Sequence, residues 1–254
     1  MDITLLKVGG AELQAGPELE ALADGIAALV QRTRLIVVHG GGPEIARWQE
    51  RIGLQPHFVE GLRITDEASL EVAEMVLSGA VNKRLTARLV QRGVRALGLS
   101  GVDGGLLRAT RIVHSAGDLG RVGEIQSVDT ALLDLLLAQG LLPVVSPISL
   151  GDDGRALNVN ADHAAMVIGS AMGVGEVIFL TNVPGVLEQG AVLPSLGAER
   201  ARRMIESGEI SGGMIPKVRS ALTAVGLGVA AVRITNLQGL TEGSGTSVVR
   251  ECGH

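Results

Sequence analysis

Short aliphatic runs alternate along the chain with longer segments of helical period, and this alternation limits the fold more than any other feature. The strand candidates are residues 3–8, 34–38, 95–99, 143–146, 177–181 and 230–234. Amphipathic segments lie between them, at residues 17–32, 43–53, 66–78, 80–92, 127–139, 160–172, 196–206 and 214–226. Apolar strands that alternate with helices are typical of a parallel sheet buried on both faces. We therefore expect an α/β fold, a three-layer αβα sandwich with a mostly parallel central sheet.

One stretch interrupts this alternation. Residues 106–125 alternate between apolar and polar side chains, and turn residues occur at Ala116-Gly117-Asp118 and at Leu119-Gly120. This pattern predicts a β-hairpin. Further along, glycines on both sides of Val174 separate a helical segment from the next strand. We expect the chain to divide there, into an N-terminal lobe of residues 1–174 and a smaller C-terminal lobe of residues 175–254.

Composition excludes several classes of function. Hydrophobic residues make up 46% of the chain and aromatic residues only 1%, so the core is aliphatic and few rings are available to stack on unpaired bases. The net charge of −5 provides no basic surface for nucleic acid. No uninterrupted apolar run is long enough to predict a membrane span, and the first residues do not have the pattern of a signal peptide. The single cysteine, Cys252, cannot form an intrachain disulfide. We expect a cytoplasmic protein.

Lysine is scarce, and its positions are informative. The chain has only Lys7, Lys83 and Lys217, although Lys and Arg together number 22. Lys7 precedes Gly9-Gly10 at the end of a strand candidate, and Lys217 follows Gly212-Gly213. An ammonium group makes a compact point contact with an oxygen, whereas a guanidinium is a broad planar fork. Two lysines beside glycines that expose the backbone suggest a site for phosphate.

A second glycine motif, His39-Gly40-Gly41-Gly42-Pro43, follows a strand candidate directly. Glycines allow the backbone to approach an anion, and the N-terminus of the next helix adds favourable partial charge. The motif has neither the Gly-Lys-Ser/Thr ending of a Walker A loop nor the Rossmann spacing. It indicates either an anion site or only a tight turn, and we favour the anion site. His39 is expected to be a packing residue, or a residue that supports the site residues from behind, rather than a catalytic base.

Two further segments carry polar side chains at helix entries. Thr65 or Asp66 is expected to cap a helix, and Arg63 just before them is placed either to clamp a carboxylate or to lie in solvent. In Asn158-Val159-Asn160-Ala161-Asp162 the three polar residues share one side if the segment is extended. They are candidates for a site, although capping of the following helix explains them equally well. The segment from Ser211 to Lys217 is expected to be either a flexible loop that closes over a phosphate or an ordinary connection between helices.

Taken together and in order, these motifs resemble those of the amino-acid kinase family along nearly the whole chain. The matching segments are Lys7-Val8-Gly9-Gly10, His39-Gly40-Gly41-Gly42, Gly61-Leu62-Arg63-Ile64-Thr65, Val81-Asn82-Lys83, Asn158-Val159-Asn160-Ala161-Asp162, Val183-Pro184-Gly185-Val186 and Gly212-Gly213-Met214-Ile215-Pro216-Lys217. The resemblance implies that Lys7 and Lys217, from opposite lobes, flank the phosphoryl group during its transfer. It also implies that Asp162 hydrogen-bonds both lysines and does not act as a general base, because the acceptor carboxylate is already ionised.

The resemblance assigns the remaining candidate residues to two groups. The acceptor substrate is expected to contact Gly41, Gly42, Arg63, Asn158 and Asn160. The nucleotide and its phosphates are expected to contact Gly9, Gly10, Gly40, Thr181, Gly185, Gly213 and Met214. Lys83 is expected to be structural. The N-terminal lobe then binds the amino acid and forms the dimer, and the C-terminal lobe binds ATP.

Within the family, the motifs are most similar to those of members that phosphorylate the side-chain carboxylate of N-acetyl-L-glutamate with ATP, in the second step of arginine biosynthesis. Mg²⁺ is expected to be held mainly by the nucleotide phosphates, because the sequence shows no metal-ligand spacing. Asn182 replaces an aspartate common in relatives, which puts one polar contact near the nucleotide in doubt. The chain begins at its first strand and lacks the usual effector pattern near its end, so an arginine-insensitive homodimer is expected. The alternatives are a kinase for carrier-protein-linked α-aminoadipate in lysine biosynthesis and a ligand-binding relative without catalysis.

Overall fold

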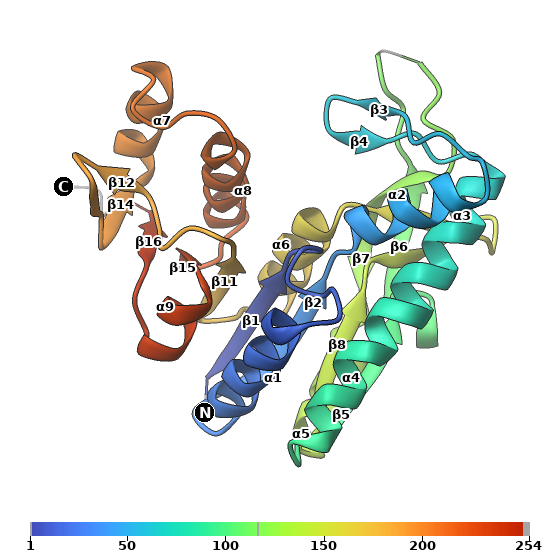
Figure 1. Ribbon diagram of the computed structural model, residues 1–254, viewed down its shortest axis with the longest axis horizontal. Helices are drawn as coiled ribbons and strands as arrows, with labels where there is room; N and C mark the ends of the chain where they lie inside the picture. The colour runs from blue at the N-terminus through green and yellow to red at the C-terminus, as the bar shows by residue number, and fades with distance from the viewer. Residues whose placement is uncertain (1, 116, 251–254) are drawn as a thin grey trace.

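The computed structural model describes residues 2–115 and 117–250, so the predictions for Ala116 and Cys252 lie outside the described residues. Within these ranges, eight strands form one large sheet (Figure 1). Their spatial order is β14 (Ser195–Gly197), β16 (Thr246–Val249), β15 (Ala231–Thr235), β11 (Glu176–Leu180), β1 (Ile3–Val8), β2 (Arg34–His39), β8 (Leu142–Ser146) and β5 (Ala96–Ser100). Every neighbouring pair of this sheet in the described chain is parallel except β15 with β16. All six predicted strands lie in it.

Helices cover both faces of this sheet, as expected for three layers (Figure 1). Alternate strand residues enter separate cores: Leu5 and Ile36 pack on one side, and Leu6 and Val37 on the other. The first core is covered by α5 (Thr130–Ala138), α6 (Ala161–Ala171), α7 (Ala198–Glu206) and α8 (Met214–Gly226). The second is covered by α1 (Pro17–Val30), α2 (Gly42–Arg51), α3 (Glu67–Glu74), η1 (Met75–Val81), α4 (Asn82–Gln91) and α9 (Leu237–Glu242). Lys7 has the parity of Leu5, so its side chain leaves the sheet on the α6 side.

The structure corrects the prediction of two separate helices at residues 66–78 and 80–92. Helix α3, the π-helical segment η1 and helix α4 follow one another without a break, and Asp66 caps the start by accepting from the Ser69 N–H at 2.8 Å. Gly79, where the periodicity changes, lies inside η1. A π-helical turn adds residues to a helix and shifts its apolar stripe, which looks in sequence like the end of one helix and the start of another.

The interruption at residues 106–125 is part of a small closed barrel in the described chain. Its strands are β6 (Leu107–Arg111), β7 (Val122–Val128), β9 (Ile148–Gly151) and β10 (Ala156–Val159). Strands β6 and β7 pair antiparallel, as the predicted hairpin requires. The predicted helix 127–139 begins later, at Thr130, because Val128 still belongs to β7 and Asp129 caps the helix.

Short elements complete the chain: the hairpins β3 (Phe58–Val59) with β4 (Leu62–Arg63) and β12 (Leu187–Glu188) with β13 (Ala191–Val192), and the 3-10 turn η2 (Asp103–Gly105). In Figure 1 the C-terminal elements stand apart from the part that carries the β3–β4 hairpin, and the two meet where β11 pairs with β1. None of the helices in the described part of the chain is long and apolar enough to cross a bilayer.

Candidate active site

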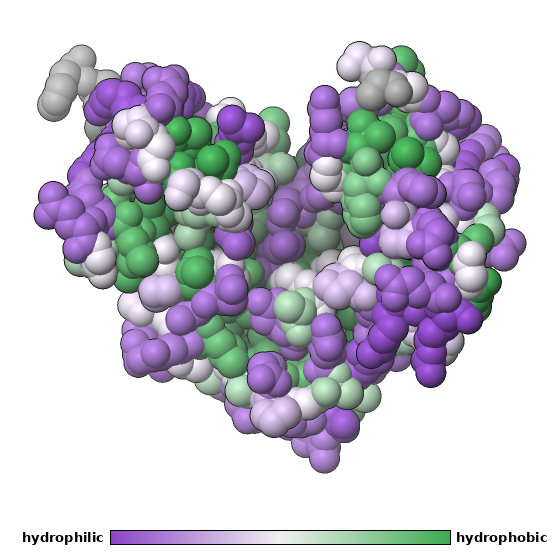
Figure 2. All heavy atoms as spheres, turned by 45° about the horizontal axis from the view of Figure 1, so that its top comes forward, coloured by the Kyte–Doolittle hydropathy of each residue, from purple (hydrophilic) through white to green (hydrophobic). Residues whose placement is uncertain are grey.

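A cleft lies at the carboxyl ends of β1 and β2, and Figure 2 shows the hollow between the two parts of the molecule. The N-terminal side of the cleft contains a cavity of about 240 Å³. Nine of the residues that the sequence predicts for the site line it: Lys7, Gly10, Gly40, Gly41, Gly42, Arg63, Asn158, Asn160 and Asp162. These residues come from segments that lie far apart in the chain, and the fold brings them to one edge of the sheet.

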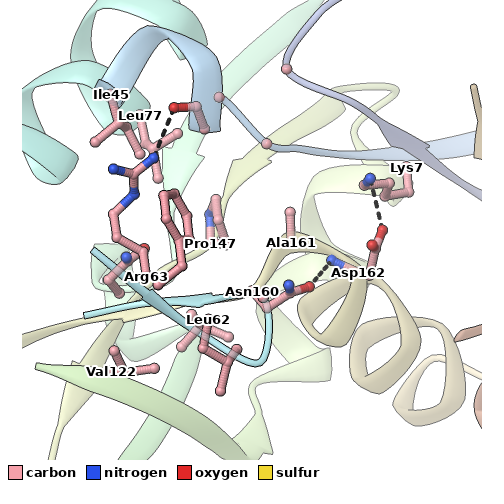
Figure 3. Close-up of a pocket in the computed structure, with 18 residues that line it drawn as sticks. Lys7, Ile45, Leu62, Arg63, Leu77, Val122, Pro147, Asn160, Ala161 and Asp162 are labelled. Atoms are coloured by element: carbon pink, nitrogen blue, oxygen red, sulfur yellow. Dashed lines mark hydrogen bonds and ion pairs between the residues drawn. The ribbon is translucent and has the colours of Figure 1, made fainter. Parts of the chain in front are cut away.

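Lys7 and Asp162 form an ion pair on one side of this cavity (Figure 3). Lys7 Nζ lies 2.7 Å from Asp162 Oδ1, with the two side chains 16% and 37% exposed. Asp162 is the second residue of α6, and Asn160 caps this helix by accepting from the N–H groups of Asp162 at 2.8 Å and His163 at 3.2 Å. The segment is therefore extended through β10 and Asn160, and Asn160 caps the helix as well as lining the cavity. The cap fixes Asp162 against Lys7.

The two glycine loops touch each other beside this ion pair. A Cβ atom added to Gly10 would lie 2.8 Å from Pro43 Cδ and 3.0 Å from the Cα of Gly41. No larger residue fits at position 10 without separating the loops. Helix α2 begins at Gly42, and in its first turn Pro43 has no N–H, while Glu44 and Ile45 donate to Gly41 O at 3.0 Å. The N–H groups of Gly41 and Gly42, which line the cavity, have no acceptor among the described residues. The loops therefore offer bare backbone donors close to the ammonium group of Lys7.

Arg63 occupies the opposite side of the cavity (Figure 3) and is 9% exposed. Its guanidinium donates to Gly42 O at 3.0 Å and to Gln49 Oε1, and lies over the Phe58 ring with 4.7 Å to the centroid. It has no carboxylate partner among the described residues. Burial lowers the pKa of Arg63, because no opposite charge compensates for lost hydration. A buried cation that faces a cavity in this way favours an anionic ligand.

Three residues that support Arg63 and Asn158 were not predicted. Gln49 is fully buried and bridges Arg63 to Ser69 Oγ, to which its Nε2 donates at 2.8 Å. Thr65 Oγ1 donates to Arg63 O at 2.9 Å and accepts from Asn158 Nδ2 at 3.1 Å. Phe58, one of only two phenylalanines, stacks on the guanidinium. Gln49 lies two helical turns after Gly42 on α2, and this spacing could have placed it on the same face of the helix as the glycine loop. Its partner Arg63 is visible only in the fold.

Lys217 lies in a separate cavity on the C-terminal side, of about 510 Å³, with Gly185, Gly213 and Met214. Its Nζ donates to Gly213 O at 3.4 Å, and no contact with Asp162 is present among the described residues. A third hollow is lined by both Asp162 and Pro216, so the two sides face each other across the cleft. Of the remaining candidates, Thr181 is buried and borders a neighbouring cavity. Gly9 lies against the Glu12 side chain, since a Cβ atom added to Gly9 would be 2.6 Å from Glu12 Oε2.

His39 is fully buried beneath the glycine loop, and burial lowers its pKa to about 4. An unfolded histidine titrates near 6.5, so between about pH 4 and 6.5 the unfolded chain binds more protons than the folded one. Folding stability from this group is therefore complete above 6.5 and falls as the pH drops towards 4, by up to about 3 kcal/mol. We expect His39→Leu to flatten the unfolding free energy across this window in urea titrations. An unchanged slope contradicts the assignment.

This arrangement of lysine, carboxylate, glycine loops and buried arginine can be compared with known proteins. A model of the amino acid kinase family matches residues 2–236. The chain belongs to the amino acid kinase family. Among family relatives, the acetylglutamate kinase of Roseiflexus sp. (strain RS-1) is 51% identical over 247 residues, covering 97% of this chain and 93% of the relative. The acetylglutamate kinase of Methanopyrus kandleri is 44% identical over 252 residues, covering 96% and 99%.

Solved structures of amino acid kinase fold agree with this membership. The N-acetylglutamate synthase of Neisseria gonorrhoeae, complexed with coenzyme A and N-acetyl-glutamate, superposes with a TM-score of 0.87 at 28% identity, over 99% of this chain and 60% of that one. The smu.665 protein of Streptococcus mutans gives 0.82 at 28% identity, over 98% of both chains. The carbamate kinase of Giardia gives 0.71 at 12% identity, over 98% and 99%, which supports the fold alone.

Proposed function

We propose that this protein transfers the γ-phosphoryl group of ATP to the side-chain carboxylate of N-acetyl-L-glutamate, giving N-acetyl-L-glutamyl 5-phosphate for arginine biosynthesis. Full-length similarity to acetylglutamate kinases at 40–51% identity supports this activity over the carrier-linked aminoadipate alternative. The observation in the structure that carries it is Arg63, a buried cation without a carboxylate partner, set across one small cavity from the Lys7–Asp162 pair. Because the reaction consumes ATP, we propose the cytoplasm as its compartment.

The acceptor is held at two points in this proposal. Arg63 binds the α-carboxylate through its guanidinium, and the Asn158 side chain adds a polar contact on the same side. The side-chain carboxylate then points towards Lys7, whose ammonium group attracts its negative charge. Asn160 lies between these ends at the start of α6. The acceptor is ionised at neutral pH, so the protein needs to align it and stabilise charge rather than activate it.

ATP occupies the cavity on the C-terminal side in this proposal, with Gly185, Gly213 and Met214 around the nucleotide. Closure of the cleft then brings Lys217 to the phosphoryl group opposite Lys7, with Asp162 between them. In this proposal the lobe of residues 1–174 binds the acceptor, and the lobe of residues 175–254 binds the nucleotide. The described residues contain no cluster of His, Cys, Asp or Glu able to hold a metal ion, so the nucleotide phosphates are the ligands that Mg²⁺ would have here. Bound in this way, Mg²⁺ would neutralise charge on the transferring phosphoryl group.

A homodimer is also part of this proposal. Strand β5 forms one edge of the large sheet, and exposed edges of this kind are usually covered. Leu97 on β5 is 37% exposed and Val90 on α4 is 53% exposed. A second copy on this edge would cover both side chains. Light scattering tests this part separately from activity.

The activity is tested by ATP-dependent phosphorylation with a choice of acceptors. We expect an acyl phosphate, trapped as its hydroxamate with hydroxylamine, with N-acetyl-L-glutamate and at least 100-fold less product with free L-glutamate, whose α-ammonium replaces the neutral amide. A peptide ending in α-aminoadipate, and a reaction without acceptor, complete the set. Preference for the aminoadipate peptide supports the lysine pathway, and ligand binding without turnover supports the non-catalytic reading. Either result overturns the proposal.

A further inference from the structure

His39, Asn82 and Lys83 form a connected polar cluster behind the glycine loop, and none of them lines the acceptor cavity. His39 and Asn82 are fully buried. Buried polar side chains in an aliphatic core are costly unless they are hydrogen-bonded, and a satisfied network holds its members in one arrangement. The proposed reaction makes no direct use of these three side chains.

The hydrogen bonds of this cluster have a fixed direction. Lys83 Nζ donates to Asn82 Oδ1 at 3.1 Å and to Gly98 O at 2.8 Å, and a protonated amine only donates. The amide of Asn82 is thereby oriented with Oδ1 towards the ammonium, and its Nδ2 donates to Val144 O at 2.8 Å.

The hydrogen bonds of the His39 imidazole ring can be assigned a direction in the same way. Asn82 Nδ2 also lies 3.0 Å from His39 Nε2 and 3.3 Å from Leu99 O. The amide nitrogen has no lone pair to accept a hydrogen bond, so Nε2 is the acceptor and shares the second amide proton with Leu99 O. His39 Nδ1 lies 2.9 Å from Gly40 O, which only accepts, so Nδ1 donates. Both contacts are satisfied by one species, the neutral ring with its proton on Nδ1.

The last bond in the series sets the orientation of a peptide in the cavity wall. In a trans peptide, the C=O of one residue and the N–H of the next point in opposite directions. Gly40 O points inward to His39, so the Gly41 N–H points outward, and Gly41 lines the cavity. The Gly41 N–H donates to no group among the described residues. It is a free donor beside the place of phosphoryl transfer.

Packing supports the same peptide from behind. A Cβ at Gly41 would lie 2.6 Å from Leu77 Cδ2 and 3.5 Å from Val81 Cγ2, both in η1, so the π-helical segment lies directly against the loop. At the other end of the cluster, a Cβ at Gly98 would lie 2.0 Å from Asn82 Oδ1. Glycine at that position allows α4 to approach β5 closely enough for Lys83 to reach the strand.

We propose that Lys83, Asn82 and His39 form a positioning relay that holds the Gly40–Gly41 peptide with the Gly41 N–H directed at the transferring phosphoryl group. The role of the relay in catalysis rests on the proposed function, whereas the state of the ring does not. His39 works as a neutral ring of fixed tautomer and exchanges no proton with the substrates. The charge of Lys83 serves to orient the Asn82 amide.

The ring is tested directly by ¹⁵N NMR of histidine-labelled protein. The chain has five histidines, and the signals of His39 are those lost in His39→Leu. Between pH 6 and 8, we expect the neutral Nδ1–H form in the wild-type protein. In Asn82→Leu, which removes the donor to Nε2, we expect the signals to report a mixture of tautomers. A wild-type ring protonated on Nε2, or charged in this range, overturns the relay whatever the protein phosphorylates.

A matched pair of variants tests the effect on catalysis. His39→Asn and His39→Leu introduce side chains with the same number and branching of heavy atoms, but the Asn amide retains a donor near the position of Nδ1. We expect His39→Leu and Asn82→Leu to lower kcat about 100-fold with KM for both substrates within about threefold, since a phosphate donor is misdirected. His39→Asn should recover at least tenfold of this loss. Thr86→Val, one turn further along α4, removes a hydroxyl that donates to the backbone C=O of Asn82 at 2.8 Å and not to its side chain, so this control should keep wild-type kcat.

Equal kcat losses in His39→Asn and His39→Leu at equal melting temperature overturn the relay. So does a change confined to stability with kcat unchanged. If the wild-type protein does not phosphorylate N-acetyl-L-glutamate at all, the proposed function fails instead, and the NMR result still decides the tautomer.

Discussion

We expect Lys217→Met to lower kcat for N-acetyl-L-glutamate phosphorylation by about 1000-fold, while KM for the acetylated amino acid changes by less than about threefold. Lys217 is the first-turn cation of α8 and lies across the cleft from Lys7 and Asp162. In the proposed mechanism its ammonium group neutralises charge that develops on the phosphoryl group during transfer. Methionine keeps the unbranched apolar stem of the side chain and removes the ammonium group, with its charge and its hydrogen-bond donors. Steady-state kinetics with each substrate varied in turn provide the measurement.

Arg219→Met is the matched control for this prediction. Arg219 is an exposed cation on the same helix, two residues further on, and borders a hollow between α7 and α8 rather than the cleft. The substitution removes an equal charge from the C-terminal side, so wild-type kcat is expected. Near-wild-type turnover in Lys217→Met, or equal losses in both variants, would refute a specific role for Lys217.

The second large effect is expected for Arg63→Leu, which should raise KM for N-acetyl-L-glutamate by at least about 100-fold. Loss of a charge-assisted, two-pronged contact with a carboxylate costs about 2–5 kcal/mol. The KM for ATP should stay within about threefold, since the cavity proposed for the nucleotide is separate from Arg63. Arg63→Lys should be intermediate, because lysine keeps the charge and loses the fork.

Stability separates this binding role from a structural one. Wild-type Arg63 is a buried cation without a carboxylate, so replacing it with leucine relieves a desolvation cost while Gln49 and Gly42 O lose a donor. These changes oppose each other, and we expect the free energy of unfolding to shift by no more than about 1 kcal/mol. A variant that loses several kcal/mol of stability together with its affinity would show that Arg63 mainly holds the fold.

The layers of the fold followed from the sequence because strands buried on both faces read as continuous aliphatic runs. All six predicted strands are present in the large sheet. Strands β14 and β16 were missed because they are short and lie beside glycines and polar residues, and their pairing depends on long-range contacts with β15. The continuity of the helix from α3 through η1 to α4 was also not predicted. A π-helical turn has no composition of its own, and packing against Gly41 stabilises it.

The candidate site was predictable where a local motif places a residue at a strand end or helix start. Lys7, Asn158 and Asp162 lie together in one cavity, as the motifs and the family resemblance indicated. The supports of the site were not predictable, because Gln49 and Thr65 act through partners distant in sequence. The convergence of Lys217 with Asp162 remains a prediction about the closed cleft.

The pairing of β1 with β11 has a consequence for the two sides of the cleft. Residues Thr4 to Lys7 align with Glu176 to Phe179, so one hydrogen-bond ladder joins the N-terminal and C-terminal parts of the large sheet. Excision of either part would leave an open sheet edge and expose aliphatic side chains of both cores. We therefore expect the two proposed lobes to unfold as a single cooperative unit. Neither would then be a module that can be exchanged without a replacement for the missing strand.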